Sequence, residues 1–354
     1  MIGRQLKRFF KLWRRVSTLI ATEFHSKTSV PLRRRMFAWR NGFLSESLII
    51  YQLDENNTGD YLSDYDRLVK TPKINGKHSE ILNNKIIFNR IAGIGQFQVP
   101  SELFWINKGT IFSLQDENPT LVEPTDILDL CRDKGRVIVK PVAGGGGKNV
   151  LMLEANNDQF YVNTDRVPAK DLEDLLRKRS NAIVTEFVKQ HQYATDIFPL
   201  VCNSIRIVTM WDYQTGSTFV AAAVHRFGRT TTIPVDNWSR GGLSVFIDIE
   251  QGRLGKCVAR TSNGAIEWYS AHPDSHQKIE GLEVPHWSKI TEQLLLASNQ
   301  LPFTPYIGWD VVVTDAGFRV LEGNNYSDVN LIQAHAPLLR DPRVRRFFEH
   351  HGII

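Results

Sequence analysis

The stretch VIVKPVAGGGGKNVLML, residues 137–153, is the clearest indication of the fold in this sequence. Two runs rich in β-branched and apolar residues flank four successive glycines, residues 144–147, and this pattern is typical of a β-hairpin with a flexible tip. Lys140 lies on the first strand just before the glycines, where its positive charge could meet phosphates that the exposed N–H groups of the loop also bind. Glycine loops are common at hairpin tips for conformational reasons alone, so a purely structural tip is the alternative.

Two common phosphate-binding motifs do not fit this stretch. A Walker loop needs GxxxxGK[ST] at the start of a helix, whereas Lys148 is followed by Asn149 rather than by Ser or Thr. The stretch also lacks the GxGxxG that follows the first strand of a dinucleotide-binding domain. The sequence therefore favours a different phosphate-binding arrangement.

A second hairpin is expected at GWDVVVTDAGFRVLEGN, residues 308–324, with its turn at 315–317. Side chains alternate along a strand, so Glu322 and Asn324 share one face, and Asp310 lies on the partner strand. Three oxygen donors of this kind suit Mg²⁺ that bridges nucleotide phosphates. The alternative is a pair of solvated hairpin acids.

Composition excludes several classes of protein. Hydrophobic residues make up 42% of the 354 residues, which excludes wholesale disorder. The three cysteines form no CxxC pair and no zinc-binding spacing, and a disulfide scaffold is not expected. No run approaches 18 apolar residues and no signal peptide is recognisable. These features predict a cytoplasmic protein.

The positive charge is concentrated at the N-terminus. Residues 1–40 contain eleven Lys and Arg residues and one acid, Glu23, whereas the remainder has 32 basic against 37 acidic residues. The body is therefore not expected to bind nucleic acid. Apolar residues recur at helical spacing in this arm, which predicts a basic amphipathic helix with the stripe Ile2, Leu6, Phe9, Trp13, Val16 and Ile20. The stripe either docks on the body or attaches residues 1–20 to an anionic membrane surface or polymer, which would place the protein on the inner membrane face.

Four regions of an α+β protein are expected. Residues 1–40 form the arm, and residues 41–94 form a small leading domain with a strand at 47–53 and a linker helix at 83–94 whose face is Ile87, Ile91 and Ile94. Residues 95–190 form a unit of helices and an antiparallel sheet that carries the glycine lid. Residues 191–354 form a strand-rich unit with the metal site, closed by a helix that starts at Asp341 and Pro342.

Five segments occur in an order that resembles the ATP-grasp superfamily, namely NNKIIFNRIAGIGQFQVP (83–100), the glycine hairpin, VTEFV (184–188), NSIRIV (203–208) and the 308–324 hairpin. Within it, the chain is most similar to the sugar-transfer-associated ATP-grasp proteins, which are related to the α-L-glutamate ligases. The similarity covers about 80–335. It implies two α+β subdomains that sandwich ATP.

The resemblance also implies roles for single residues. Contacts to the nucleotide phosphates are implied for Lys85, Lys140, Gly144, Gly145, Gly146 and Gly147, and contacts to adenine for Glu186, Phe187 and Val188. Two magnesium ions are implied at Asp310, Glu322 and Asn324, and Arg206 resembles the arginine that steadies the transferred phosphate.

Two positions depart from the family pattern. Many ligases carry an arginine two residues before the equivalent of Asp310, but Gly308 stands there, so Arg226 or Arg240 would have to substitute. Tyr193 falls near the usual place of a ribose-binding acid, and the remaining candidates for ribose are Gln190, His191 and Asp196.

The family reaction converts a carboxylate into an acyl phosphate with ATP, after which an amine attacks and ADP and phosphate are released. The resemblance implies a small-molecule or glycan carboxylate and an amine acceptor. Cations and an aromatic residue in HRFGRTTTIPVDNWSRGG, residues 225–242, suit an acidic sugar, the candidates being His225, Arg226, Arg229, Asn237, Trp238 and Arg240. The alternatives are a kinase of a sugar or small alcohol, or a membrane-associated adaptor that binds nucleotide without turnover.

Overall fold

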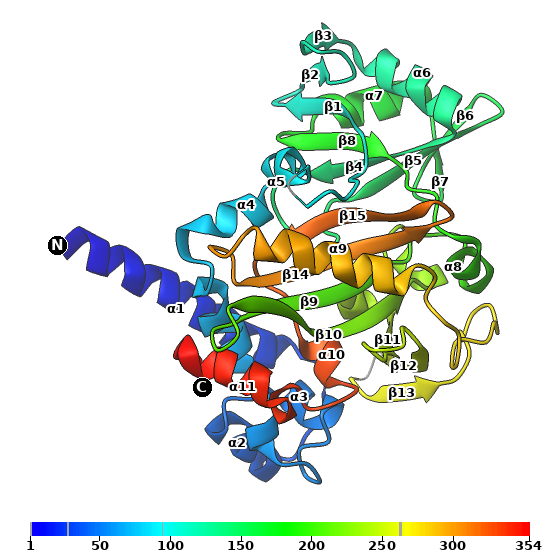
Figure 1. The fold of residues 1–354 in the computed structure, drawn as a ribbon. Coiled ribbons are helices and arrows are strands. Elements are labelled where there is room, and N and C mark those ends of the chain that lie inside the picture. Colours follow the sequence, from blue (N-terminus) through cyan, green and yellow to red (C-terminus); the bar gives the residue numbers. More distant parts are fainter. Residues whose placement is uncertain (1, 27, 94, 262–263) are drawn as a thin grey trace.

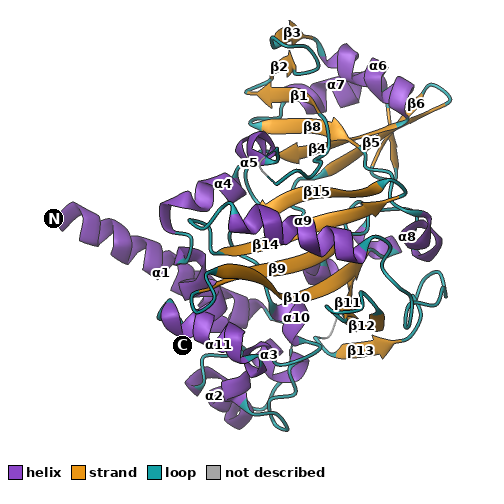
Figure 2. Cartoon of the chain, viewed as in Figure 1, coloured by secondary structure: helices purple, strands orange, loops and turns teal. Residues whose placement is uncertain are grey.

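The chain folds into two antiparallel sheets flanked by helices (Figures 1 and 2). The computed structural model describes residues 2–26, 28–93, 95–261 and 264–354, and the side chains of all of these except residues 2–12. All strand pairs of both sheets are antiparallel. The α+β class expected from the sequence is confirmed.

The first sheet has eight strands in the order β3-β2-β1-β8-β4-β5-β6-β7. They are β1 (Glu102–Asn107), β2 (Thr110–Ser113), β3 (Thr120–Val122), β4 (Arg136–Pro141), β5 (Leu151–Asn156), β6 (Gln159–Val162), β7 (Asp165–Val167) and β8 (Ala182–Glu186). Helices α6 (Pro124–Lys134) and α7 (Ala169–Arg177) bury Ile127 and Leu172 against it. β4 and β5 are paired and joined through the four glycines, so the expected glycine hairpin is confirmed.

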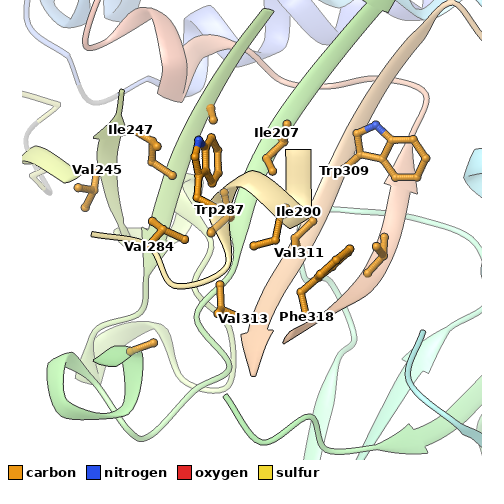
Figure 3. Packing of buried hydrophobic residues seen from close by; sticks show 14 of the residues in the cluster. Ile207, Val245, Ile247, Val284, Trp287, Ile290, Trp309, Val311, Val313 and Phe318 are labelled. Carbon is orange, nitrogen blue, oxygen red and sulfur yellow. The ribbon is translucent and has the colours of Figure 1, made fainter. Parts of the chain in front are cut away.

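The second sheet has seven strands in the order β13-β12-β11-β10-β9-β14-β15. They are β9 (Ile205–Asp212), β10 (Ser217–Phe227), β11 (Leu243–Ile247), β12 (Leu254–Arg260), β13 (Ile266–Tyr269), β14 (Tyr306–Thr314) and β15 (Gly317–Asn324). Helix α9 (Trp287–Asn299) covers one face, where Trp287 and Ile290 pack with Ile207, Trp309 and Val311 (Figure 3). The hairpin β14–β15, with its turn at 315–317, is as expected from the sequence.

Alternation on β14 decides where its polar residues lie. Ile307, Trp309 and Val311 belong to the core beneath α9, so Gly308 and Asp310 between them must face the opposite side of the sheet. That side is covered in part by α2 (Leu32–Arg40), α3 (Ser45–Ile50), α10 (Asn330–Gln333) and α11 (Pro342–His350). α11 starts as expected, because the Asp341 carboxylate accepts a hydrogen bond from the Arg343 N–H and Pro342 opens the first turn.

The strand expected at 47–53 is wrong, because residues 45–50 form α3. The start of this helix is satisfied by acids distant in sequence: the Leu44 N–H donates to Asp64 at 2.6 Å and the Ser45 N–H donates to Glu23 at 2.9 Å. These carboxylates accept hydrogen bonds from N–H groups that would otherwise be unpaired at the start of the helix. They therefore favour a helix, although Leu48, Ile49 and Ile50 are typical of a strand.

The single linker helix expected at 83–94 is also wrong in part. Two helices occur, α4 (Ser79–Asn83) and α5 (Lys85–Ile91), because Asn84 has an extended backbone and its side chain caps α5. Phe88 is fully buried, whereas Ile87 of the predicted face is 42% exposed. Ile94, also assigned to that face, lies outside the described residues.

The arm contains α1 (Ile2–His25), and its N-terminal half extends beyond the rest of the molecule (Figure 1). The side chains of Ile2, Leu6 and Phe9, members of the expected stripe, lie outside the described residues. Trp13 is 61% and Ile20 48% exposed, so this part of the stripe is not docked on the body. None of the described helices is long and apolar enough to cross a membrane. The remaining helix is α8 (Gln192–Ile197).

Candidate functional site

A cavity of about 490 Å³ lies between the two sheets. Its walls come from β4, β8 and the glycine loop on one side and from β9, β14 and β15 on the other. Most of the site residues expected from the sequence line it: Lys85, Lys140, Gly144, Gly145, Gly146, Gly147, Glu186, Phe187, Val188, Arg206, Arg226, Asp310, Glu322 and Asn324. A volume of this size is typical of small-ligand sites.

Lys85 connects both walls of the cavity. Its ammonium lies 3.0 Å from the Glu322 carboxylate on β15 and donates to the Gly144 carbonyl at 3.0 Å. The residue is held at the start of α5, where Asn84 accepts hydrogen bonds from the N–H groups of the first turn. The glycine loop and the second sheet are thus bridged by one positive charge.

Lys140 adds a second cation on β4. Burial, followed by the neighbouring charge of Lys85, lowers the pKa of Lys140 to about 8, although Glu322 opposes the shift. The two lysines form a positive patch under the glycine loop. An anion such as a phosphate would relieve the repulsion between them.

Asp310 is the centre of a buried cluster of charges. It lies opposite Arg206 across β14 and β9, and the guanidinium donates to both carboxylate oxygens, at 2.5 and 3.1 Å. Arg226 donates to the second oxygen at 3.0 Å. Burial alone would raise the pKa of Asp310, but Arg206 and Arg226 lower it to about 2. The carboxylate is therefore ionised at neutral pH.

Asp236 completes this cluster and was not singled out in the sequence. Its carboxylate accepts from the Ser204 N–H at 2.8 Å and the Ser204 hydroxyl at 2.5 Å, and lies 3.4 Å from Arg226. Burial raises the pKa of Asp236, with Arg226 opposing the shift. The only available signal was its position inside the cationic segment 225–242, since no spacing rule marks it.

The glycine loop reaches across to the second sheet's side of the cavity. Gly147 has a φ of +64°, and a Cβ at this position would lie 3.0 Å from Val235. Val235 belongs to a segment, residues 234–239, that lines the same cavity. A side chain larger than hydrogen at Gly147 would both strain the backbone and press against that segment.

The end of β8 provides the expected hinge residues. The Glu186 carboxylate accepts from the Ser101 N–H at 2.9 Å, and the Glu186 N–H donates to the Ser101 carbonyl at 3.1 Å. The Arg136 guanidinium lies 5.6 Å from the centre of the Phe187 ring. Phe187 and Val188 line the cavity and give this end an apolar character.

The oxygen donors expected to bind magnesium lie together. Asp310 and Glu322 are opposite one another on β14 and β15, and the Asn324 amide donates to the Gly308 carbonyl at 3.2 Å. Among the described residues, no group of three His, Cys, Asp or Glu is arranged to hold a metal ion. Two carboxylates and one amide oxygen on one face nevertheless fit a hard cation that is completed by phosphate oxygens.

Position 308 has no room for the arginine that many ligases carry. A Cβ on Gly308 would lie 2.4 Å from the Ser327 hydroxyl oxygen and 2.6 Å from its Cβ. Of the two candidates to replace that arginine, Arg226 lines the cavity and contacts Asp310, whereas Arg240 is not among the described residues that line it. The expectation for Arg240 therefore has no structural support.

Several other sequence candidates lie away from the cavity. His225 is buried, bonds to the Tyr193 hydroxyl at 2.6 Å, and has its pKa lowered to about 3 by burial. Arg229 pairs with Asp274 at 3.1 Å. Asn237 and Trp238 of the same segment do line the cavity.

None of the three ribose candidates lines the cavity among the described residues. The Gln190 side chain donates to the Phe198 carbonyl at 3.1 Å and accepts from the Asn203 N–H at 2.8 Å. His191 caps α8, and Asp196 accepts from Gln192 at 2.6 Å. These side chains stabilise the loop after β8, which sequence spacing could not distinguish from a ligand contact.

Lysines, a glycine loop, arginines and carboxylates line one cavity between two antiparallel α+β layers, as expected for an ATP-grasp protein. The chain belongs to the sugar-transfer associated ATP-grasp family, whose model matches residues 67–341. Membership of this family implies the use of ATP. No curated protein matches the chain.

The chain is similar to several solved structures at low sequence identity. PurK, N5-carboxyaminoimidazole ribonucleotide synthetase, in its ADP complex has 9% identity and a TM-score of 0.40, with 70% of this chain and 46% of that chain covered. The ATP-grasp ligase PsnB with a minimal precursor has 16% identity and a TM-score of 0.40, with 77% and 62% covered. The L-amino acid ligase from Bacillus licheniformis has 12% identity and a TM-score of 0.38, with 73% and 44% covered. The chain thus spans about half the length of these proteins.

Proposed function

We propose that the protein is an ATP-dependent carboxylate–amine ligase that forms an acyl phosphate and releases ADP and phosphate. The observation that carries this proposal is the Asp310 cluster, in which two buried arginines converge beside the Lys85–Glu322 pair under a glycine loop. Fixed positive charge of this kind supports the proposal, because the transfer of a phosphoryl group to a carboxylate needs its negative charge to be offset.

In the proposed reaction, Lys85, Lys140 and the N–H groups of residues 144–147 bind the β- and γ-phosphates, and residues 186–188 receive adenine. A substrate carboxylate oxygen attacks the γ-phosphorus and ADP leaves. Arg206 and Arg226 stabilise the transferred phosphoryl group. The amine then attacks the acyl carbon and phosphate leaves.

Magnesium held by Asp310, Glu322 and Asn324 would offset the charge on the β- and γ-phosphates. The closed glycine loop would exclude water from the reactive intermediate. No protein nucleophile is required for this chemistry.

The carboxylate substrate is proposed to be an acidic sugar or a polysaccharide precursor. Support comes from Trp238, whose buried indole N–H lacks a hydrogen-bond partner in the described structure, and from Asn237, both of which line the cavity next to Arg226. An aromatic ring, an amide and a guanidinium are the groups that bind a sugar face and its carboxylate. This would place the protein in polysaccharide biosynthesis.

The test incubates purified protein with MgATP and pools of sugar acids and amino acids, with and without hydroxylamine. ADP together with a hydroxamate is expected, because hydroxylamine traps an acyl phosphate. AMP would contradict the mechanism, and ADP with a stable phosphorylated sugar would favour a kinase. Glu322→Gln should be inactive, whereas Glu250→Gln, at an exposed turn, should retain activity.

We propose that the protein is cytoplasmic and that its arm attaches it to the inner membrane face. Residues 1–20 carry an apolar stripe beside cations, and the exposure of Trp13 and Ile20 supports contact with something outside the body. An anionic lipid surface fits the charge.

A further inference from the structure

We infer that α2 forms a second lipid-binding element, so that the protein meets an anionic membrane with a face made by α2 and the end of α1. This inference rests on the attachment proposed for residues 1–20. It extends the lipid-binding surface to α2, which has exposed side chains and positive charge.

The apolar side chains of α2 face solvent in a helical stripe. Leu32, Met36 and Trp39, spaced by four and three residues, are 67%, 42% and 44% exposed, and Phe37 beside them is 42% exposed. Ala38 is fully buried and fixes which side of the helix packs on the body. Four large exposed apolar residues within nine positions are unusual for a helix that only covers a core.

The charge around this stripe indicates which kind of surface it contacts. α2 contains four arginines and no acid. Arg34 pairs with Asp54 and Arg35 with Glu23, but Arg33 and Arg40 are exposed and have no acidic partner among the described side chains. A tryptophan and aliphatic residues flanked by free arginines match the boundary between anionic headgroups and acyl chains.

A buried clamp joins α2 to α1. The Glu23 carboxylate near the end of α1 accepts from Ser45 and lies 3.5 Å from Arg35 of α2. Phe24, next to the clamp, is 76% exposed and continues the stripe of Trp13 and Ile20, since the spacing of seven and four residues keeps all three on one side of α1. The two helices are therefore held together at the position where their apolar residues are exposed.

The position of α2 is compatible with catalysis. It lies at the end of the molecule opposite the eight-stranded sheet (Figure 1), whereas the cavity lies between the sheets. A membrane at α2 would leave the glycine loop free to open.

The experiment is flotation of the full chain with vesicles of 30% phosphatidylserine and 70% phosphatidylcholine, and with pure phosphatidylcholine, at low and high salt. We expect binding to the anionic vesicles at low salt and its loss at high salt. Arg33→Gln with Arg40→Gln should weaken binding by about fivefold for each arginine. Leu32→Ser with Trp39→Ser should weaken the binding to anionic vesicles at low salt, because the apolar side chains no longer insert at the headgroup boundary.

Matched controls come from exposed residues distant from α2 in the sequence. Lys134→Gln with Lys178→Gln controls for the loss of charge, and Leu121→Ser with Leu200→Ser controls for the loss of apolar area. These should bind like the unaltered chain. Thermal unfolding by circular dichroism checks that each variant is folded, and all substituted residues are exposed.

Failure of the two proposals can be told apart. If Trp13→Ser with Ile20→Ser abolishes flotation while the α2 variants bind normally, the arm binds lipid and the inference about α2 is wrong. If the full chain ignores anionic vesicles at low salt, both proposals are overturned. If the chain dimerises through α2 in solution instead, only the inference about α2 is overturned.

Discussion

Lys140 should set the upper pH limit of nucleotide binding. Its pKa of about 8 lies below that of an ordinary lysine, so the side chain is cationic below pH 8 and loses its charge as the pH rises through that value. Because phosphate binding needs the cation, kcat/KM for ATP should fall about tenfold per pH unit above 8. A pH–rate profile measures this.

Lys140→Arg is the informative variant, since a guanidinium stays charged in this range. Its profile should be flat to pH 9.5, even if the rate is lower. Lys140→Ala should lack turnover while remaining folded. A falling limb that persists in the arginine variant would assign the titration to another group.

Asp310 and Glu322 should differ in their contribution to stability, although the same role in turnover is proposed for both. Asp310 is fully buried with two arginines, so Asp310→Asn leaves buried positive charge without its main partner and should cost about 3–5 kcal/mol in the free energy of unfolding. The Glu322 side chain is 21% exposed and pairs with one lysine, so Glu322→Gln should cost about 1 kcal/mol. Urea denaturation measures both.

The same contrast predicts an acid dependence. The pKa of Asp310 is lowered to about 2, so its charge stabilises the fold above pH 4 and this contribution is lost as the pH falls from 4 towards 2. The Asp310→Asn variant should lack that part of the acid sensitivity. If Asp310→Asn and Glu322→Gln lower the free energy of unfolding equally at pH 7, the greater importance of the buried Asp310 cluster is contradicted.

At the scale of elements, the glycine loop should change its dynamics with nucleotide. Gly144, Gly146 and Gly147 all have positive φ, a conformation that glycine adopts more readily than other residues. We expect amide exchange at residues 143–149 to slow with saturating MgATP. Hydrogen-exchange mass spectrometry measures it, with the β5–β6 turn at 157–158 as the internal control. Unchanged exchange would mean that the glycines only form a hairpin tip.

The elements that could be predicted from sequence are those whose residues carry their own pattern. Apolar and β-branched runs specify β14 and β15, and their turn fixes the register that brings Asp310 opposite Glu322. α3 could not be predicted, because Glu23 and Asp64, some twenty residues away, satisfy its first N–H groups. The sequence also left open whether Arg226 or Arg240 contacts Asp310. In the structure Arg226 lies near the end of β10 and contacts Ser204, and residue spacing does not show this.

At the scale of the whole molecule, Arg67 connects the leading segment to the cavity. Its guanidinium donates to Asp64 at 2.7 Å, to Asp328 at 2.6 Å and to the Tyr326 hydroxyl at 3.2 Å. Tyr326 and Asp328 line the cavity. Residues outside the two sheets therefore hold part of its wall, which no local sequence pattern indicated.

Arg67→Leu should destabilise the fold by about 3–5 kcal/mol, because it leaves Asp64 buried without its cation. Arg340→Leu is the matched control: the Arg340 side chain is 60% exposed in its pair with Asp60, so the cost should stay below about 1 kcal/mol. Urea denaturation compares the two. Similar losses would show that the Arg67 cluster is not special.

The pairing of Lys85 with Glu322, and of two arginines with Asp310, has a thermodynamic consequence. In the proposed reaction, phosphate oxygens would contact the same cations that pair with these carboxylates in the structure. A nucleotide bound at these cations would compete with both carboxylates, and carboxylates displaced next to phosphates would need a divalent cation. Nucleotide and cation should therefore bind cooperatively, each weakly alone and tightly together, because each removes the electrostatic penalty that the other creates.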